Sequence, residues 1–154
     1  MLRRLIIAVS MALLLAGCST YHSTGRQQLE ALPQHYSQFD LKLAWDTKVV
    51  GNQTLIEGMV QNVRYASMHD LEIWVTVLDP AGKVVARAMT FVIPMQLRID
   101  ETAEFGVKLP VAVTPGMKLR FTYKYTGNEG GSGTGTPFGG GSWMQSFDAV
   151  TPAR

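Results

Sequence analysis

The chain has 154 residues, enough for one domain, and its 14 Lys and Arg against 12 Asp and Glu give a formal net charge of +2 at pH 7. Arg3 and Arg4 supply this excess. No run of basic residues forms a stripe that would neutralise phosphates, so nucleic acid is excluded as an expected partner. Cys18 is the only cysteine, so a disulfide within the chain is excluded and the burial of apolar side chains must stabilise the fold.

Residues 1–17 have the three parts of a secretory signal peptide. Two arginines come near the start, residues 5–15 are almost all apolar, and a small Ala-Gly pair precedes Cys18. The apolar run is shorter than the roughly 20 residues that a membrane-spanning helix needs, and polar residues follow it. We therefore expect the segment to be removed rather than to remain as a membrane span.

The stretch Leu15-Ala16-Gly17-Cys18 resembles the lipobox of bacterial lipoproteins. The resemblance implies a diacylglycerol on the Cys18 sulfur, cleavage before Cys18 and usually an acyl chain such as palmitate on the new amino group. Two or more chains anchor a protein stably. Ser19 stands where an aspartate would favour the inner membrane, which implies the outer membrane of a bacterial cell envelope, facing the periplasm. The alternative is a secreted protein with a free cysteine near its N-terminus, which an oxidising compartment disfavours.

Residues 18–37 are predicted to be a tether between the lipid and a folded domain that spans residues 38–154. The segment is polar, and Gly25 and Pro33 interrupt it. Residues 26–32 have the composition of a short helix that Pro33 would end. A flexible coil of this length would keep the domain near the membrane surface.

Alternating apolar and polar residues predict strands at the start of the domain. In residues 38–46 one face carries the apolar side chains Phe39, Leu41, Leu43 and Trp45. Residues 54–60 predict a second strand. Apolar residues fall on both faces of this strand, so the sequence does not decide which face is buried.

Residues 70–79 give the strongest strand signal, because β-branched residues are frequent and the alternation is regular. The sequence Asp79-Pro80-Ala81-Gly82 predicts a tight turn, and residues 83–92 return as the hairpin partner. Further strands are predicted over residues 102–109, 116–125 and 142–150. About seven short strands without a long helix predict an all-β fold, an antiparallel immunoglobulin-like β-sandwich.

Three segments resemble the FxLYD-type immunoglobulin-like domains of bacterial envelope proteins. They are residues 57–62, 71–79 and 82–85, which match a G-x-V-x-N strand, an apolar strand that ends in Asp and a D-x-x-G-x-V-V hairpin. The resemblance covers about residues 54–107. The chain departs from the residues of the family's name at Val75, Val77 and Leu78. The resemblance implies the same sandwich, and it carries over no catalytic residue.

No pattern of residues points to catalysis, a metal site or a cofactor. The three histidines are not at metal-ligand spacing from one another or from the cysteine. The carboxylate pairs Asp70/Glu72 and Asp100/Glu101 need a cleft for acid–base work, and a solvated surface is the simpler interpretation. The serines do not form a Gly-x-Ser-x-Gly motif.

The surface candidates are aromatic residues and a glycine-rich loop. Residues 127–142 contain eight glycines and lack the lysine of a phosphate-binding loop, so we predict a hairpin loop in which Phe138 has no core role. Trp74 shares a strand face with polar residues, and Trp143 follows the loop. Core packing is the default for both tryptophans, and the other interpretation is an exposed aromatic that stacks on a sugar or anchors a partner.

The leading hypothesis is a lipid-anchored, non-catalytic interaction or structural module of the bacterial cell envelope, with an envelope protein as its partner. Such a partner would add a strand at a sheet edge or dock on the glycine-rich loop. The alternative is an envelope lipoprotein that binds glycan or peptidoglycan fragments through Trp74 or Trp143. An enzyme that gathers His69, Asp70 and Glu72 in one pocket is the third hypothesis.

Overall fold

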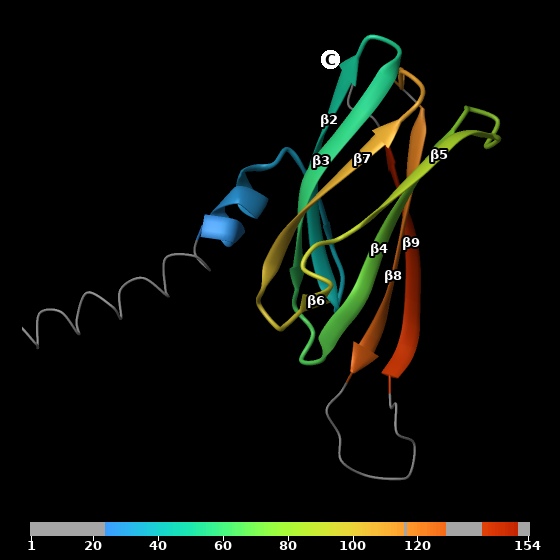
Figure 1. Ribbon diagram of the computed structural model, residues 1–154. Coiled ribbons are helices and arrows are strands. Elements are labelled where there is room, and N and C mark those ends of the chain that lie inside the picture. The colour runs from blue at the N-terminus through green and yellow to red at the C-terminus, as the bar shows by residue number, and fades with distance from the viewer. Residues whose placement is uncertain (1–23, 116, 129–139, 151–154) are drawn as a thin grey trace, which may run out of the picture.

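The computed structural model describes residues 24–115, 117–128 and 140–150, and it consists of two antiparallel sheets packed face to face (Figure 1). Sheet I has the strand order β1 (Gln34–Ser37), β2 (Leu41–Val50), β3 (Gln53–Asn62) and β7 (Thr102–Leu109). Sheet II has the order β5 (Val84–Phe91), β4 (Ser67–Leu78), β8 (Lys118–Asn128) and β9 (Gly140–Val150). The two-residue strand β6 (Gln96–Leu97) pairs with the start of β4.

The strand order confirms the predicted immunoglobulin-like sandwich. Strands β2, β3 and β7 pair as strands A, B and E do in an immunoglobulin domain, and β4, β8 and β9 pair as C, F and G do. Strand β5 extends sheet II on the β4 side, and β1 extends sheet I on the β2 side. Each sheet therefore has two edge strands, and β1 and β9 are edges on the same side of the sandwich, because Tyr36 of β1 stacks on Phe147 of β9.

The core forms where the inward faces of the two sheets meet. The period-two pattern of β4 places Ile73, Val75 and Val77 inside, and that of β2 places Leu43 and Trp45 inside. Burial of each such side chain contributes roughly 1.5 to 3 kcal/mol, so these alternating residues are the main reason that the strands pair in this register.

A helix over residues 24–31 covers part of the outer face of sheet I (Figure 1). Its Leu29 is buried against Ala44 of β2 and Met59 of β3, and Leu32 packs beside them. This contact explains the undecided face of the predicted strand 54–60. The strand is covered on both sides, by the core within and by the helix outside.

The predicted tether differs from the structure in its second half. Residues 24–31 are helical and β1 (Gln34–Ser37) pairs with β2, so the sandwich begins before the predicted boundary at residue 38. The short helix predicted over residues 26–32 is present over residues 24–31, and it ends before Pro33. A strand of four residues shows too little alternation to be recognised, which is why β1 was assigned to the tether. The predicted signal peptide over residues 1–17 and Cys18 lie outside the described residues.

The first strand of the domain departs from the predicted pattern at its start. Phe39 is 68% exposed and Asp40 is 2% exposed, the reverse of the expected alternation. Strand β2 begins only at Leu41, and the chain bends at the two residues before it, which turns the Asp40 side chain inward.

The two predicted hairpins of sheet II are present. At the first, Asp79 accepts hydrogen bonds from Gly82 and Lys83, and Gly82 has the positive φ of 81° that only glycine adopts without strain. At the second, β8 and β9 extend into the predicted glycine-rich loop, because Gly127 pairs with Gly141. Residues 129–139 of that loop lie outside the described residues. In the described part of the chain, no helix is long and apolar enough to cross a membrane.

Candidate functional site

Trp74 lies on the outer face of sheet II and is half-buried. Its Nε1–H donates to Glu72 Oε2 at 2.9 Å, and Glu72 also lies 3.7 Å from Lys124 Nζ. In the sheet register, Trp74 lies between Met89 of β5 and Thr122 of β8. The indole is therefore part of a mixed polar and apolar surface, and its only polar atom already has an acceptor.

Trp143 lies near the start of β9 and is 39% exposed. The guanidinium of Arg64 lies 4.1 Å from its ring centroid, a cation–π contact that covers one face of the indole. A Cβ on Gly127 or Gly141 would come within 3.2 and 3.3 Å of the indole nitrogen. These two glycines let the indole lie close to the hairpin backbone.

The structure does not bring the two tryptophans together. Trp74 of β4 pairs with Thr122 of β8, which pairs with Ser146 of β9. Trp143 of β9 instead pairs with Tyr125 of β8, whose side chain faces inward. The two side chains therefore leave opposite faces of sheet II. Phe138, the third surface candidate, lies outside the described residues. Binding of a glycan through Trp74 or Trp143 stays a prediction.

The residues of the enzyme hypothesis have structural contacts. Asp70 occupies a β-bulge of β4 with a φ of 52°, and its N–H donates to the Met95 carbonyl. Glu72 is held by Trp74 and Lys124. Among the described residues, no three His, Cys, Asp or Glu side chains gather where they could hold a metal ion.

A buried polar cluster links the two sheets at the end of the sandwich near Trp143, and the sequence did not reveal it. Asp40 accepts hydrogen bonds from the Tyr123 hydroxyl at 2.9 Å and from the Tyr125 hydroxyl at 3.0 Å. Arg64 Nη1 donates to the Tyr125 hydroxyl at 3.2 Å. Tyr123 and Tyr125 alternate regularly along β8, but their partner comes from a bend about 80 residues earlier in the chain.

These contacts keep both phenols protonated. Burial and the hydrogen bond to Asp40 raise the pKa of Tyr123, and burial raises the pKa of Tyr125 to about 12 although Arg64 opposes the shift. In the unfolded chain these phenols release their protons near pH 10.

Alkaline pH is therefore expected to destabilise the fold between about pH 10 and pH 12. In this range the unfolded chain loses protons that the folded chain keeps, so the free energy of unfolding falls as pH rises, by up to about 2 kcal/mol for Tyr125. Urea denaturation at a series of pH values, followed by far-UV circular dichroism, measures this loss. The variant Tyr125→Phe should show a shallower dependence, and an unchanged slope would contradict the assignment.

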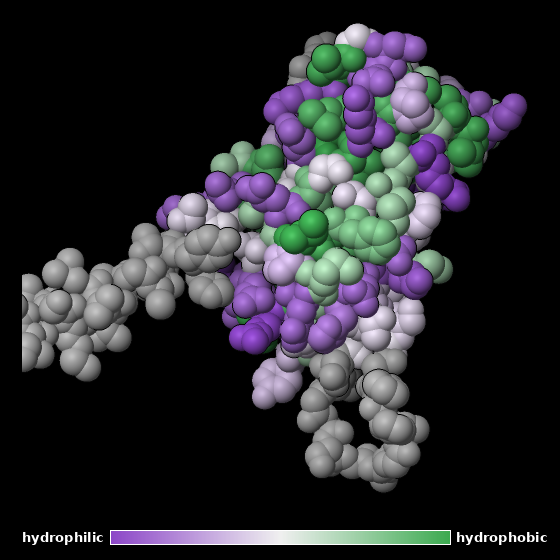
Figure 2. Space-filling view, in the orientation of Figure 1, coloured by the Kyte–Doolittle hydropathy of each residue, from purple (hydrophilic) through white to green (hydrophobic). Residues whose placement is uncertain are grey.

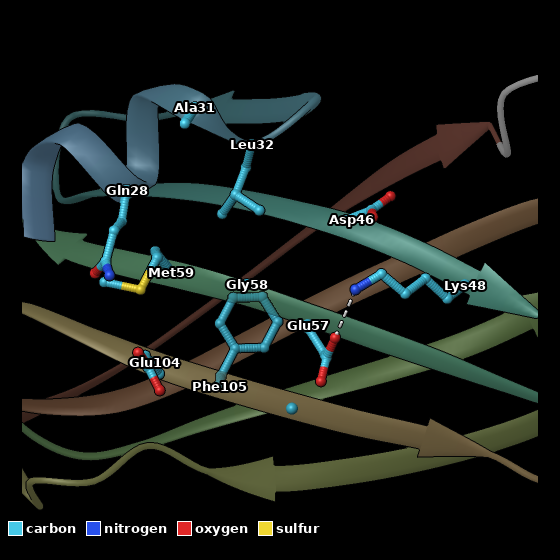
Figure 3. A pocket seen from close by; sticks show the side chains of 11 residues that line it. Gln28, Ala31, Leu32, Asp46, Lys48, Glu57, Gly58, Met59, Glu104 and Phe105 are labelled. Atoms are coloured by element: carbon cyan, nitrogen blue, oxygen red, sulfur yellow. Dashed lines mark hydrogen bonds and ion pairs between the residues drawn. The ribbon is translucent and has the colours of Figure 1, made fainter.

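One cavity lies on the outer face of sheet I, beside the helix over residues 24–31 (Figure 3). It has a volume of about 610 Å³, and its rim carries the carboxylates of Asp46, Glu57 and Glu104. Lys48 Nζ forms an ion pair with Glu57 at 3.0 Å. Figure 3 shows Gln28 and Leu32 of the N-terminal segment on one side and Glu104 of β7 on the other. The rim is acidic and open to solvent, and exposed carboxylates in this arrangement are stable without a ligand.

A second cavity, of about 330 Å³, opens between the edge strands β1 and β9. We call it the β1–β9 groove, and it is lined by Gln34 and Tyr36 of β1, Trp45 of β2, and Phe147 and Ala149 of β9. Phe147 stacks on Tyr36 at 3.6 Å between ring centroids. The Nε1 atom of Trp45 and the Nε2 atom of Gln34 are buried and have no hydrogen-bond partner.

Other exposed apolar side chains include Phe91, Ile93, Met95 and Ile99 in one segment from the end of β5 to the start of β7, and four valines at hairpin ends. Val49, Val50, Val84 and Val85 are between 46% and 66% exposed. They belong to the ends of the β2–β3 and β4–β5 hairpins, where Figure 2 shows hydrophobic residues interleaved with hydrophilic ones. Dispersed apolar residues of this kind are normal on a soluble domain.

Comparisons with known proteins return structures only. No family model matches the chain, and no curated protein matches it. Among solved structures, the GAE domain of yeast GGA1 is 10% identical to this chain, with a TM-score of 0.48. The alignment covers 76% of this chain and 96% of the GAE domain. The GAE domain of GGA2p from Saccharomyces cerevisiae is 10% identical with a TM-score of 0.44, covering 77% and 96%. A DUF4426 family protein from Pseudomonas aeruginosa is 13% identical with a TM-score of 0.41, again covering 77% and 96%. Such low identities and TM-scores carry no argument about function.

Proposed function

We propose that this chain is a lipid-anchored protein of a bacterial cell envelope whose sandwich binds a protein partner. The lipobox-like stretch that ends at Cys18 supports the anchor. Ser19, in place of an aspartate, supports the outer membrane. The three segments that resemble FxLYD-type domains are consistent with an envelope role, and membership of that family is part of the proposal.

The observation that carries the binding role is the free edge of β9. Within the described residues, no strand pairs with the side of β9 that faces away from β8. A strand edge presents unpaired N–H and C=O groups, and proteins usually protect long edges with lysine, proline or a short length. Strand β9 has 11 residues, contains no proline or lysine, and its one charged residue, Asp148, is tied to Arg120 at 2.7 Å.

The other edges are better protected. Strand β1 has only four residues, β5 carries Arg87, and β7 carries Glu104 and Lys108. Because an unprotected edge invites aggregation, a protein that keeps one uses it for strand addition by a partner or shields it in an assembly. The free edge of β9 therefore favours an interaction module.

The anchor is tested by the substitution Cys18→Ser. We expect it to abolish acylation, because only a thiol accepts the diacylglycerol, and to move the protein from the membrane to the soluble fraction. Metabolic labelling with a radioactive or alkyne fatty acid and fractionation of cells measure both changes. Globomycin, which blocks the lipoprotein signal peptidase, should cause the unprocessed form to accumulate.

A matched variant separates anchoring from sorting. Ser19→Asp should remain acylated and should shift the protein from the outer to the inner membrane in density-gradient fractions. Unchanged membrane association and gel mobility of Cys18→Ser, together with insensitivity to globomycin, would refute the anchor.

A further inference from the structure

The β1–β9 groove lies where the sandwich is open along one side. Gln34 and Tyr36 of β1 and Phe147 and Ala149 of β9 extend from the two edge strands toward the interior, and all four line the groove. Trp45 lies behind them and is 3% exposed. The groove therefore lies between two edge strands rather than between loops, and the alternate residues His35, Asp148 and Val150 complete its lining.

The aromatic side chains of the groove are held rigidly. Phe147 stacks on Tyr36 and on Phe121, with interplanar angles of 6° and 2°. Trp45 packs at 4.6 Å from Phe121 and at 5.8 Å from Phe147, measured between ring centroids. A site of this kind loses little conformational entropy when a ligand binds, because its walls are already ordered.

Two of the residues that line this groove carry a buried hydrogen-bond donor. Gln34 and Trp45 are paired across β1 and β2, so their side chains are neighbours on the same face of sheet I. The Trp45 Nε1 atom and the Gln34 Nε2 atom are buried, and no acceptor in the described chain reaches either one. A buried donor without an acceptor is energetically unfavourable, because it has lost its hydrogen bond to water. Both groups are donors, so the ligand that satisfies them must supply an acceptor.

The same groove borders the free edge of β9. The wall made by Phe147 and Ala149 belongs to the strand whose outer backbone groups are unpaired in the described chain. An extended peptide that paired with β9 would place alternate side chains on the inward side, over the groove. An extended peptide paired with β9 could therefore use its backbone for pairing and one of its side chains to reach the two donors.

We propose that the β1–β9 groove binds an extended segment of a partner protein, which pairs with β9 and presents a side-chain oxygen to Trp45 and Gln34. Aspartate, glutamate, asparagine or glutamine supplies such an oxygen. This proposal rests on the protein-binding part of the proposed function and not on the lipid anchor. It names the surface and the chemistry of the segment that binds there.

The test uses the full acylated chain in detergent micelles and a phage-displayed library of random 10-residue peptides. Selected peptides are synthesised, and their dissociation constants are measured by fluorescence anisotropy. Ala149→Lys fills the groove from β9, and Ala88→Lys is the matched control, because Ala88 is a half-buried, inward-facing alanine on the opposite edge strand of the same sheet. We expect Ala149→Lys to weaken binding at least tenfold, and Ala88→Lys to change it less than twofold.

A double-mutant cycle tests the donors. Trp45→Phe keeps an aromatic ring and removes the N–H, and Gln34→Met removes the amide at similar length. Each should weaken a peptide that carries the acceptor side chain about tenfold, and should leave unchanged a peptide in which leucine replaces that residue. Melting temperatures from circular dichroism confirm that each variant is folded. If Trp45→Phe does not fold, Gln34→Met alone decides the cycle.

Other results would overturn the proposal. It is refuted if no peptide is selected, if Ala149→Lys leaves affinity unchanged, or if the donor variants have the same effect on both peptides, as they would if the side-chain oxygen did not reach the donors. It is also refuted if sedimentation shows a dimer that Ala149→Lys dissociates, because the edge would then belong to a second copy. Photo-crosslinking in intact cells from Gln145 of β9 and from Thr90 of β5 distinguishes failure of the groove proposal from failure of the proposed protein-binding function. A partner captured only from Thr90 would preserve the binding function and refute the groove.

Discussion

Replacing Asp40 by alanine is expected to lower the free energy of unfolding by about 3 to 5 kcal/mol. The carboxylate is 2% exposed and accepts hydrogen bonds from Tyr123 and Tyr125. Its removal leaves two buried hydroxyls without their acceptor, and each costs about 1 to 3 kcal/mol. Because Asp40 lies between β1 and β2 of sheet I and the tyrosines belong to sheet II, the loss is also a loss of contact between the sheets.

Urea denaturation of Asp40→Ala measures this change, and Glu57→Ala is the control. Glu57 is also a carboxylate on sheet I, but it is half exposed and paired only with Lys48, so its removal should change stability by no more than about 1 kcal/mol. The double variant Tyr123→Phe/Tyr125→Phe should reduce the cost of removing Asp40, because no hydroxyl is then stranded. An equal cost in both backgrounds would show that the carboxylate acts through other contacts.

The strands of the sandwich could be predicted because their information is local. Residues 71–77 carry an aliphatic side chain at every second position, and a strand with one buried face shows this pattern whatever its neighbours are. The turn at Asp79–Gly82 is equally local, since proline and glycine fix its dihedral angles. The same reasoning fails for β1 and β6, which have four and two residues and depend on the strand beside them.

The polar cluster and the groove could not be predicted, because register and bends decide them. Asp40 lies between Phe39 and Leu41, where the alternating pattern predicts a surface residue. Only the bend before β2 turns its side chain inward. The groove joins Gln34, from the segment predicted as a tether, with Phe147, more than 100 residues later. Trp45 was recognised as a core residue. That its N–H would be left without an acceptor follows from its neighbours and not from its own pattern.

Residue type and position in the sequence single out Trp74 and Trp143 as surface candidates, and the structure shows that each already has a contact within the chain. The Trp74 indole nitrogen is engaged by Glu72, and one Trp143 face is covered by Arg64. An exposed tryptophan in a sequence is therefore a weaker indication of a binding surface than an unpaired strand edge, which only the sheet order shows.

Gly58 is paired in register with the groove's tryptophan, and Gly58→Val is expected to destabilise the fold by about 3 kcal/mol. In register Gly58 stands between Trp45 of β2 and Phe105 of β7, both buried. A Cβ at this position would lie 2.6 Å from the Phe105 ring and would also collide with the Ala44 carbonyl. A glycine weakens a strand, so its presence here is explained by the space that the Phe105 ring and the Ala44 carbonyl require.

Gly106 provides the matched control, because it is the residue after Phe105 and faces the other side of sheet I. A Cβ on Gly106 would meet no atom within 4 Å, so Gly106→Val should keep or slightly raise stability, as β-branched residues favour strands. In the background Phe105→Leu, part of the Gly58→Val cost should disappear, since the smaller side chain can move aside. Equal effects of the two glycine substitutions would show that backbone entropy, and not the row Trp45–Gly58–Phe105, governs this part of the sheet. If the row governs it, Gly58→Val should also weaken peptide binding in the β1–β9 groove, because a displaced Phe105 and Ala44 backbone would shift Trp45.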